Sequence, residues 1–455
     1  MCRRGLLAFS VICGISHSLS ASAETLKEAL AKAYLGNPNL EAARAELRSV
    51  DEGVPEALSG WRPTLTLDYD IGKSRNFVPN TTSSFGESQN RTPKTASVSV
   101  EQNVFNGWRT ESGIESAEQA VLSQRAQLLS TEQRIMLDTG TSYMDVIRDE
   151  AVLKLNQSNE RVLRRQLEAT RDRFEVGEVT RTDVAQAESR LSRAIADRIQ
   201  AEGALTISRA AYRSVVGDFP GTLGSASPLG GLPANKTEAM SFAKAGNPDV
   251  KVAQHNERSA KTAIKSAEGA LYPSVDIEGE LTRRDQLSSP DSRTEEASIT
   301  ASFSVPLYQA GGVSARIRAA KQSWSQARKD LDAAIRTAVQ EAAQSWERYA
   351  TARAQLDAFT AEVRAAEIAL EGVKQEAQVG SRTVLDVLDA EQELLDARVS
   401  LVRARRDVTV ASLEVRRAVG TLVASKLDLG VKLYDPSINY KNARDRWFGT
   451  SIGTK

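Results

Sequence analysis

Four short stretches of the chain alternate between apolar and polar residues, as half-exposed β-strands do. They read TLTLDYDIG from Thr64, ASVSVEQ from Ala96, SVDIEGEL from Ser274 and SITASFSVPL from Ser298. Each is close to the length of about 9–11 residues that a tilted strand needs to cross a bilayer. The polar positions of the first and third stretches are rich in Asp and Glu, which is typical of strands that face a water-filled lumen. The pattern predicts strands with one face toward lipid and the other toward water.

Polar loops connect the strands of each pair, over residues 73–93 and 282–296. A small soluble sheet with one face on a core is the alternative interpretation of the alternation, but long polar loops favour the outward-facing loops of a barrel. Four strands cannot enclose a pore, because the smallest membrane barrels have about eight. An open sheet edge cannot lie in lipid. Several copies must therefore share one barrel, and three copies would supply twelve strands.

Two stretches with no proline and few glycines, residues 108–175 and 313–379, predict very long helices. At about 1.5 Å per residue, each would extend roughly 100 Å. In the second stretch, apolar or small residues recur at alternating steps of four and three, which is a heptad pattern. This seam consists of Leu331, Ile335, Ala338, Ala342, Ser345, Tyr349, Ala352, Leu356 and Phe359. A left-handed coiled coil follows from that spacing.

The two halves of the chain repeat one another. RFEVGEVTRTDVAQAESRLSRA from Arg173 matches EAQVGSRTVLDVLDAEQELLDAR from Glu376, and Gly177 aligns with Gly380. A glycine directly after a helix relieves the reversal of the chain, so each VG pair predicts a turn between two helices. A GNP motif near the start of each half predicts a helix with Asn as its cap and Pro as its first residue.

The repeats divide the chain into five segments. We expect a signal peptide over residues 1–23, a first structural repeat over 24–216, an inter-repeat linker over 217–236, a second repeat over 237–420 and a C-terminal tail over 421–455. The linker is rich in Gly and Pro. The tail has little helical period and is expected to be a separate packed segment.

The N-terminus has the features of a secretory signal: Arg3 and Arg4, the short apolar stretch GLLAFSVICGI, and an ASA cleavage motif. Both cysteines, Cys2 and Cys13, would leave with it, so neither a disulfide nor a Cys/His zinc site can form and no metal or cofactor is expected. The 59 Lys and Arg balance the 59 Asp and Glu, which argues against nucleic acid as a partner. The sequence therefore indicates a periplasmic or outer-membrane protein.

The duplicated half, with two strands and a helix pair of unequal length, resembles the TolC family of outer-membrane efflux proteins. The resemblance covers essentially the whole mature chain and rests on VGSRTVLDVLDAEQELLDAR, the GNP helix starts, PLYQAGG and the tail YDPSINYKNARDRWFG. It implies a mainly helical fold with membrane β-strands, as a homotrimer with a twelve-stranded barrel in outer-membrane lipid and a coiled-coil helical tunnel in the periplasm. The tail would pack near the equatorial region of that tunnel. Docking to a periplasmic adaptor (membrane fusion) protein and to an inner-membrane pump of RND or ABC type is implied as well.

The resemblance also assigns roles to residues beside the glycine turns. Gly177 and Gly380 would lie at the periplasmic tip, and Asp386 and Asp389 would ring the periplasmic entrance. From the residues alone, a favourable interaction of the two carboxylates with the helix dipole explains them better. Links between neighbouring coils that hold the entrance shut would use Thr182, Asp183, Arg382 and Arg405. Some members have an aromatic residue near Ala377, and because this chain has none there, closure would be weaker or use other contacts.

The sequence thus predicts a passive exit duct of a tripartite efflux pump, of a type I secretion system, or of both. The alternative is a soluble periplasmic coiled-coil adaptor or scaffold, which would explain the signal and the heptads but not the alternating strands. An enzyme is not expected, because His255 is the one histidine outside the signal and lies in a polar helical stretch where a solvated side chain is expected. The cargo stays open among drugs, bile salts, siderophores and proteins.

Overall fold

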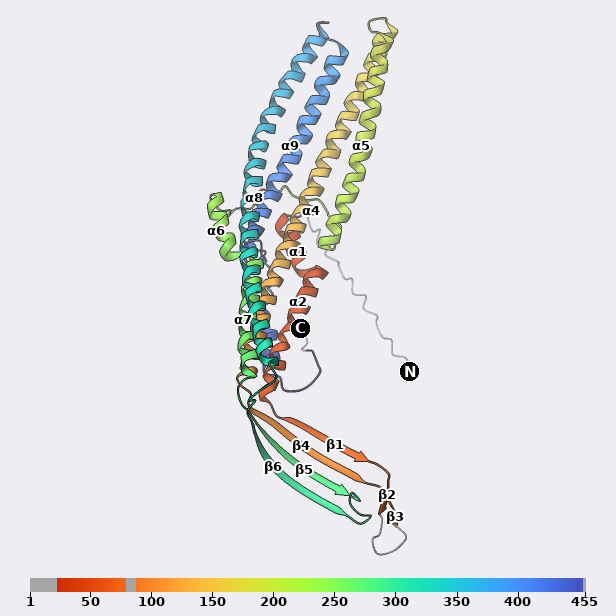
Figure 1. The fold of residues 1–455 in the computed structure, drawn as a ribbon. Helices are drawn as coiled ribbons and strands as arrows, with labels where there is room; N and C mark the ends of the chain where they lie inside the picture. The colour runs from red at the N-terminus through yellow and green to blue at the C-terminus, as the bar shows by residue number, and fades with distance from the viewer. Residues whose placement is uncertain (1–22, 79–86, 453–455) are drawn as a thin grey trace, which may run out of the picture. The chain divides into compact units, whose positions relative to one another are not determined.

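The computed structural model describes residues 23–78 and 87–452 (Figure 1). The predicted signal peptide lies outside the described residues apart from Ala23, as does the centre of the first predicted loop. The chain forms two compact units, and each takes segments from both sequence repeats. The first unit consists of the residues up to Ala33, Thr139–Pro228 and Asp357–Thr409, and the second of Tyr34–Asp138, Leu229–Leu356 and the residues from Val410.

Helices make up most of the chain. They are α1 Leu26–Gly36, α2 Pro38–Asp51, α3 Gly53–Leu58, the 3-10 turn η1 Ser59–Trp61, α4 Arg109–Glu175, α5 Arg181–Val216, α6 Lys236–Gly246, α7 Pro248–Gly269, α8 Gly312–Gln378, α9 Val384–Ala418, α10 Ala424–Leu427 and α11 Pro436–Arg444. α4 and α8 contain 67 residues each, which confirms the two very long helices. Among the described residues, no helix is long and apolar enough to cross a membrane.

The predicted heptad seam is the packing face of α8. Ala338, Ala342, Ser345 and Ala352 are buried, and the other seam residues are partly buried. In the second unit, Ala342 packs with residues of α6 and of the end of α9 in one apolar cluster. In the first unit, the same helix packs on α9 through a second apolar cluster. The spacing of the seam therefore predicted correctly which side of α8 contacts other helices.

The two GNP motifs begin helices in the same way. Asn37 and Asn247 precede the first residues of α2 and α7, and each side chain accepts a hydrogen bond from the backbone N–H two residues further on, at 2.9 and 2.8 Å. These bonds satisfy N–H groups that the first turn of a helix leaves unpaired. The predicted Asn caps are confirmed in both repeats.

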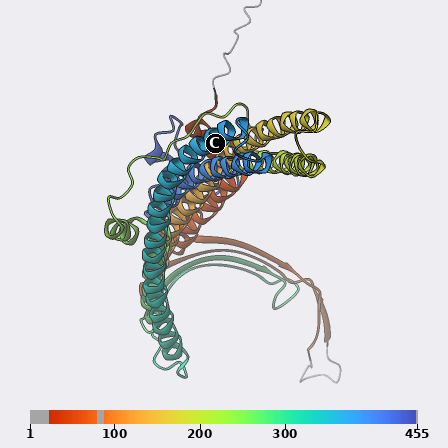
Figure 2. The ribbon, with the colours of Figure 1, turned by 90° about the horizontal axis from the view of Figure 1, so that it is seen from above.

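Four antiparallel strands form one sheet in the second unit. They are β1 Thr64–Ile71, β4 Lys94–Phe105, β5 Ser274–Asp285 and β6 Arg293–Ser304, in the order β1-β4-β5-β6. The strands of the two repeats meet where β4 pairs with β5, with Val98 opposite Leu281. The four strands curve side by side along their length, as Figure 2 shows. β1 and β6 are the two edges of this sheet.

Within the described part of the chain, no core covers the apolar face of the sheet. Every residue of β1 is exposed, and Leu65 and Leu67 are 72% and 75% exposed. On β6, Ile299 is 85% exposed. Full burial of a Leu or Ile side chain contributes about 1.5–3 kcal/mol, so a soluble sheet of this composition would cover this face. The exposure therefore contradicts the alternative of a small sheet packed on a core.

The prediction of a loop over residues 73–93 is wrong in part. Within residues 73–93, β2 Ser74–Val78 pairs with β3 Glu87–Arg91 as a separate two-stranded sheet. Strand pairing uses backbone groups, and a strand without a buried face needs no alternation of apolar residues. The hydrophobic pattern therefore carried no signal for these two strands.

The second predicted loop is shorter than expected. β5 and β6 extend into residues 282–296 and leave only residues 286–292 between them. Opposite charges stabilise the extension in place of apolar residues, because Arg284 Nη1 lies 2.9 Å from Glu296 Oε2 on the neighbouring strand. The loop's charged residues thus belong to the strands.

The C-terminal tail packs within the second unit and contains α10 and α11, two short helices that its weak helical period did not predict. The Ala424 N–H donates to Glu132 Oε1 at 2.7 Å, and Asn439 Nδ2 donates to Asp51 Oδ2 at 2.8 Å. Burial raises the pKa of both carboxyl groups. The tail is thereby tied to α2 and α4, and its place in an equatorial region stays a prediction.

Candidate functional site

Two helix-to-helix turns of the first unit carry the predicted tip residues. α4 ends at Glu175 and α8 at Gln378, and Gly177 and Gly380 follow with φ angles of 81° and 79°. These values favour glycine because a Cβ atom is strained there. Each glycine N–H donates to the carbonyl three residues before it, at 3.0 and 3.2 Å, and the next N–H donates to the carbonyl five residues before it, at 2.9 and 3.0 Å. Both helices therefore end in the same Schellman motif.

The helices that follow these turns begin with the same capping box. Thr180 N–H donates to Asp183 Oδ2 at 2.8 Å, and Asp183 N–H donates back to Thr180 Oγ1 at 3.3 Å. Thr383 and Asp386 exchange the equivalent bonds at 2.9 and 3.2 Å. The hydrogen bond from the backbone N–H of Thr383 is the largest cause that lowers the pKa of Asp386, and the bond from the Thr383 hydroxyl is the next largest. Asp386 thus stabilises the start of α9, in agreement with the local interpretation considered from the sequence.

Asp389 lies about one helical turn further along α9 and has a different partner. Arg190 of α5 donates to Asp389 Oδ1 through Nη2. The neighbouring Leu388 packs against Leu163 of α4 and Ala194 of α5 in an apolar cluster. The two predicted entrance carboxylates therefore differ: one caps a helix and the other forms an ion pair between helices.

The four predicted gate residues are not linked to one another within the described part of this chain. Thr182 and Arg405 are exposed. Arg382 Nε lies 2.8 Å from Glu376 Oε2, which belongs to the end of α8, and Asp183 caps α5. Links between coils of different copies lie outside a single chain, so the gate stays a prediction.

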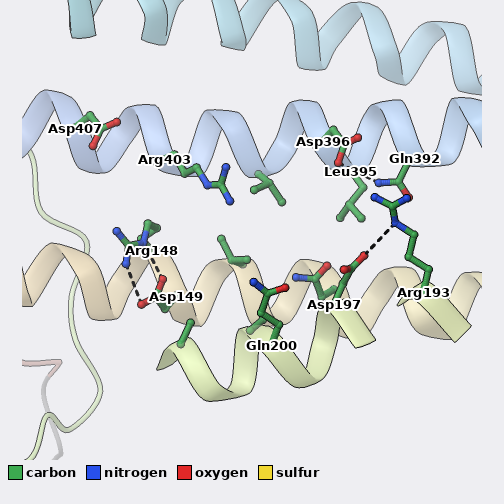
Figure 3. Close-up of a pocket in the computed structure, with 15 residues that line it drawn as sticks. Arg148, Asp149, Arg193, Asp197, Gln200, Gln392, Leu395, Asp396, Arg403 and Asp407 are labelled. Atoms are coloured by element: carbon green, nitrogen blue, oxygen red, sulfur yellow. Dashed lines mark hydrogen bonds and ion pairs between the residues drawn. The ribbon is translucent and has the colours of Figure 1, made fainter. Parts of the chain in front are cut away.

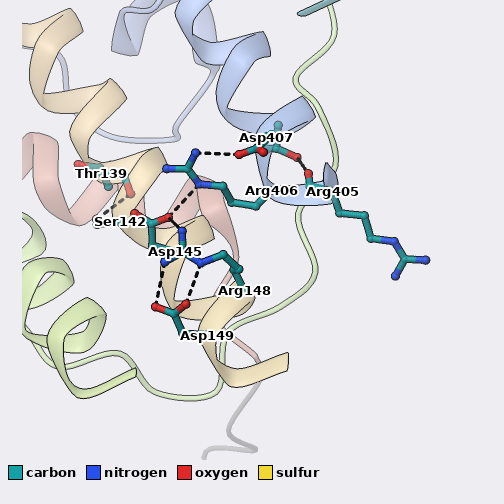
Figure 4. Close-up of polar contacts among 9 residues, drawn as sticks. Thr139, Ser142, Asp145, Arg148, Asp149, Arg405, Arg406 and Asp407 are labelled. Carbon is teal, nitrogen blue, oxygen red and sulfur yellow. Dashed lines mark hydrogen bonds and ion pairs between the residues drawn. The ribbon is translucent and has the colours of Figure 1, made fainter. Parts of the chain in front are cut away.

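A charged network joins α4 to α9 beside Arg405 (Figure 4). Arg406 Nε and Arg148 Nη1 both donate to Asp145 Oδ1 at 2.8 Å. Arg148 also donates to the two oxygens of Asp149, at 2.7 and 3.0 Å, and this contact raises its pKa. Figure 4 shows Arg405 pointing away from these groups. Sequence reasoning missed the network, although the charges of DVIRD at 145–149 were an available signal.

A cleft of about 600 Å³ lies between α4, α5 and α9 in the first unit (Figure 3). Its charged lining residues are Arg148, Asp149, Arg193, Asp197, Asp396, Arg403 and Asp407. Because arginines and aspartates are mixed on its walls, the cleft does not favour an ion of one sign. Across residues 23–78 and 87–452, no three His, Cys, Asp or Glu side chains gather as metal ligands would.

His255 differs from the expected solvated side chain. It is partly buried on α7, and its Nδ1 lies 2.9 Å from Gln119 Oε1 of α4. Desolvation by this packing lowers its pKa. The polar stretch around it did not predict the burial because the face of α7 that contacts α4 is itself polar.

The sequence matches known proteins along most of its length. The family model described as "Outer membrane efflux protein" matches residues 29–218 and 239–421. The chain is 36% identical over 431 residues to the outer membrane efflux protein BepC of Brucella suis biovar 1 (strain 1330), with 94% of this chain and 92% of BepC covered. It is 26% identical over 433 residues to the outer membrane protein TolC of Escherichia coli (strain K12), with 90% and 86% covered.

The fold is similar to that of a solved channel. The crystal structure of the Campylobacter jejuni CmeC outer membrane channel matches with a TM-score of 0.79 and covers 92% of this chain and 89% of its own. The two sequences are 14% identical, so this likeness concerns the fold. It confirms the predicted fold class of long coiled-coil helices with a small set of membrane strands.

Proposed function

The chain belongs to the outer membrane efflux protein family, and from this premise we propose that three copies of it build the exit duct of a pump that crosses the cell envelope. The protein is an efflux channel of the outer membrane. The observation that carries the proposed assembly is the sheet, whose apolar face is uncovered and whose edges are β1 and β6. An open edge is unstable in lipid, so the edges of neighbouring copies would pair.

The number of copies follows from the width that a duct needs. Two copies would give eight strands, and the interior of such a barrel is just wide enough for side chains to fill. Three copies would give twelve strands and leave room for cargo. The acidic positions of β1 and β5, among them Asp68, Asp70, Glu278 and Glu280, would then face water inside the barrel.

Native mass spectrometry of protein extracted from outer membranes in detergent tests the assembly. We expect a particle of three chains. A monomer recovered from the periplasmic fraction without detergent would contradict the proposal and would favour a soluble adaptor or scaffold.

A passive duct needs an energy source, and we propose a periplasmic adaptor and an inner-membrane pump of RND or ABC type as partners. Deletion of the gene, followed by measurement of both toxic-compound susceptibility and secreted proteins, tests this role and identifies the cargo. Raised susceptibility indicates efflux of small molecules, and loss of secreted proteins indicates type I secretion. Unchanged susceptibility and secretion would contradict an exit duct.

We propose that Asp386 and Asp389 line the periplasmic entrance, with Gly177 and Gly380 at the tip turns. Support comes from the capping box, which orders the start of α9, and from the spacing of the two aspartates on one helix face. A ring of carboxylates attracts cations, so hexamminecobalt added on the periplasmic side should block current in a planar bilayer. The double variant Asp386→Asn, Asp389→Asn should lose this block, and block at the parental concentration would place the ring elsewhere.

We propose that the closed entrance is held by Thr182 and Asp183 on one coil and Arg382 and Arg405 on a neighbouring coil. The exposed side chain of Arg405, which points away from the network in Figure 4, supports this role. Asp183→Ala together with Arg405→Ala should raise single-channel conductance, and Arg405→Ala alone tests the lock without disturbing a helix cap. Arg403→Ala on the same helix is the control, and conductance unchanged from that control would remove Arg405 from the lock.

A further inference from the structure

Asp386 and Asp389 differ in the charge of the groups that donate hydrogen bonds to them. The hydrogen-bond donors on Asp386 are the N–H and hydroxyl groups of Thr383, which are neutral and add no positive charge to the carboxylate. The charge of the nearby Arg382 contributes to the lowered pKa of Asp386, but Arg382 forms its ion pair with Glu376, at 2.8 Å, and this pair adds no net charge. Asp389 instead accepts from the guanidinium of Arg190. One carboxylate of the pair is therefore neutralised by a positive charge from another helix.

Packing on both helices fixes the position of Arg190. The next residue along α5, Leu191, packs on the cluster that contains Leu388, which directly precedes Asp389 on α9. Val384 packs on the same cluster from the start of α9. Because apolar contacts one residue away hold the two helices together, the charged partners face each other across a fixed gap. The Arg190 side chain is 30% exposed and that of Asp389 is 56% exposed, so both remain open to water and to passing ions.

We propose that Arg190 is a selectivity-determining residue of the periplasmic entrance, because it reduces the uncompensated charge there from two carboxylates per chain to one. The inference rests on the proposed entrance role of Asp386 and Asp389 and adds an arginine that this role alone does not require. Long-range attraction of ions depends on the summed charge of the groups that line a passage. An entrance with Arg190 in place prefers cations less strongly than a bare acidic ring would.

Substitutions that change the summed charge give the test. Counting Asp386, Asp389 and Arg190, each chain carries one net negative charge in the parent, two in Arg190→Gln and none in Asp389→Asn. The double variant that combines Arg190→Gln with Asp389→Asn again carries one. Cation preference, measured as the zero-current potential across a planar bilayer with a KCl gradient, should rise in Arg190→Gln and fall in Asp389→Asn. The double variant should return to the parental value. Hexamminecobalt should block Arg190→Gln at a several-fold lower concentration than the parent.

Two further variants separate charge from structure. Arg190→Lys keeps the positive charge and should keep the parental zero-current potential. Arg171→Gln combined with Glu188→Gln breaks a comparable ion pair between α4 and α5, in which Arg171 Nη2 lies 2.6 Å from Glu188 Oε1. This pair variant keeps the summed charge of the parent and should leave ion preference unchanged. A shift in this pair variant equal to that in Arg190→Gln would overturn the proposal, because the effect would then come from loosened helices.

Failure of this inference is distinguishable from failure of the entrance itself. If Asp386→Asn reduces hexamminecobalt block while Arg190→Gln matches the parent, the entrance stands and Arg190 has no part in selectivity. If neither variant changes block or zero-current potential, the entrance lies at other residues and the proposal for Arg190 is overturned with it.

Discussion

Gly177 and Gly380 hold the same left-handed backbone conformation at equivalent positions of the two repeats. The Schellman hydrogen bonds around them are the same in both turns. Among the described residues, no heavy atom beyond the glycine itself and its two chain neighbours lies within 4 Å of the place a Cβ would take at either glycine. The requirement for glycine therefore comes from the backbone angle and not from lack of space.

Replacing Gly380 by alanine should lower the stability of the folded protein. A left-handed conformation costs a residue with a Cβ about 1–2 kcal/mol, and we expect a loss of roughly that size in chemical denaturation of the detergent-solubilised protein. Gly372 lies inside α8 with open space around it, so Gly372→Ala is the matched control and should stabilise by about 0.5–1 kcal/mol. Equal effects of the two substitutions would show that the φ angle is not what selects glycine.

Asp386 links stability to pH through its cap. Its pKa is lowered in the folded state by the bonds from Thr383, so its contribution is present above the unfolded-state pKa of about 3.9 and is lost as the pH falls through the lower, folded-state value. Asp386→Asn should therefore lower the thermal midpoint at pH 7, and this difference should shrink in strong acid. Asp396 is the control on the same helix, away from its start, and Asp396→Asn should lower the thermal midpoint at pH 7 by less than Asp386→Asn does. A difference for Asp386→Asn that stays constant from pH 7 into strong acid would argue against the cap.

Single residues also mark the limit of what the repeat predicts. Aligning the halves predicted the turns at Gly177 and Gly380 and matched Asp183 with Asp386, because turns and helix starts depend on residues within one turn of helix. Arg190 could not be found this way, since its counterpart in the second repeat is Glu393. Its contact with Asp389 depends on how α5 and α9 are rotated against each other, which no local pattern encodes.

At the scale of elements, α4 and α9 are joined by charges as well as by apolar packing. The carboxylate of Asp149 is 9% exposed and receives two hydrogen bonds from Arg148, which also contacts Asp145. Arg406 adds the link to α9. A partly buried network of this kind is costly to break, because a charged group left without its partner remains away from water.

Asp149→Ala should therefore destabilise the protein by about 1–3 kcal/mol. Glu150 forms an exposed pair with Arg209, with the two side chains 36% and 46% exposed, and Glu150→Ala should cost no more than about 1 kcal/mol. Chemical denaturation of both variants in detergent gives the comparison. Equal losses would mean that burial does not strengthen the Asp149 contact.

The pattern of the sequence predicted elements well where one physical signal decides them. Absence of proline and the heptad seam gave the long helices, and alternation gave β1, β4, β5 and β6. β2 and β3 pair without a buried face, and the outer ends of β5 and β6 are stabilised by cross-strand charges such as Arg284 with Glu296. Neither arrangement produces hydrophobic alternation, so both were expected to be loops.

At the scale of the whole molecule, the exposed four-stranded sheet is the feature that indicates assembly of several copies in a membrane. A single chain leaves Leu65, Leu67 and Ile299 in contact with solvent and ends the sheet at β1 and β6. Lipid would cover the apolar side chains, and strands from neighbouring copies would complete the edges. A closed barrel shared between copies in the outer membrane, as proposed above, would meet both requirements at once.

Cysteine cross-linking between the two edge strands tests this closure most directly. Both cysteines of the chain lie in the predicted signal peptide, so introduced cysteines would be the only thiols of the mature protein. Thr66→Cys on β1 would be combined in turn with Thr300→Cys, Ser302→Cys or Ser304→Cys on β6. Within one chain these positions are three strand spacings apart, roughly 14 Å, which exceeds the Cα separation of about 4.4–6.8 Å that a disulfide needs.

Any disulfide between β1 and β6 must therefore join two copies. Combining Thr66→Cys with Asp276→Cys on the inner strand β5 is the control, because that strand would lie one spacing further from the neighbouring edge. After oxidation in outer membranes, we expect covalent dimers and trimers on a denaturing gel for at least one β1 and β6 pairing, and monomers for the control. Monomers at all three pairings would contradict a barrel closed between copies.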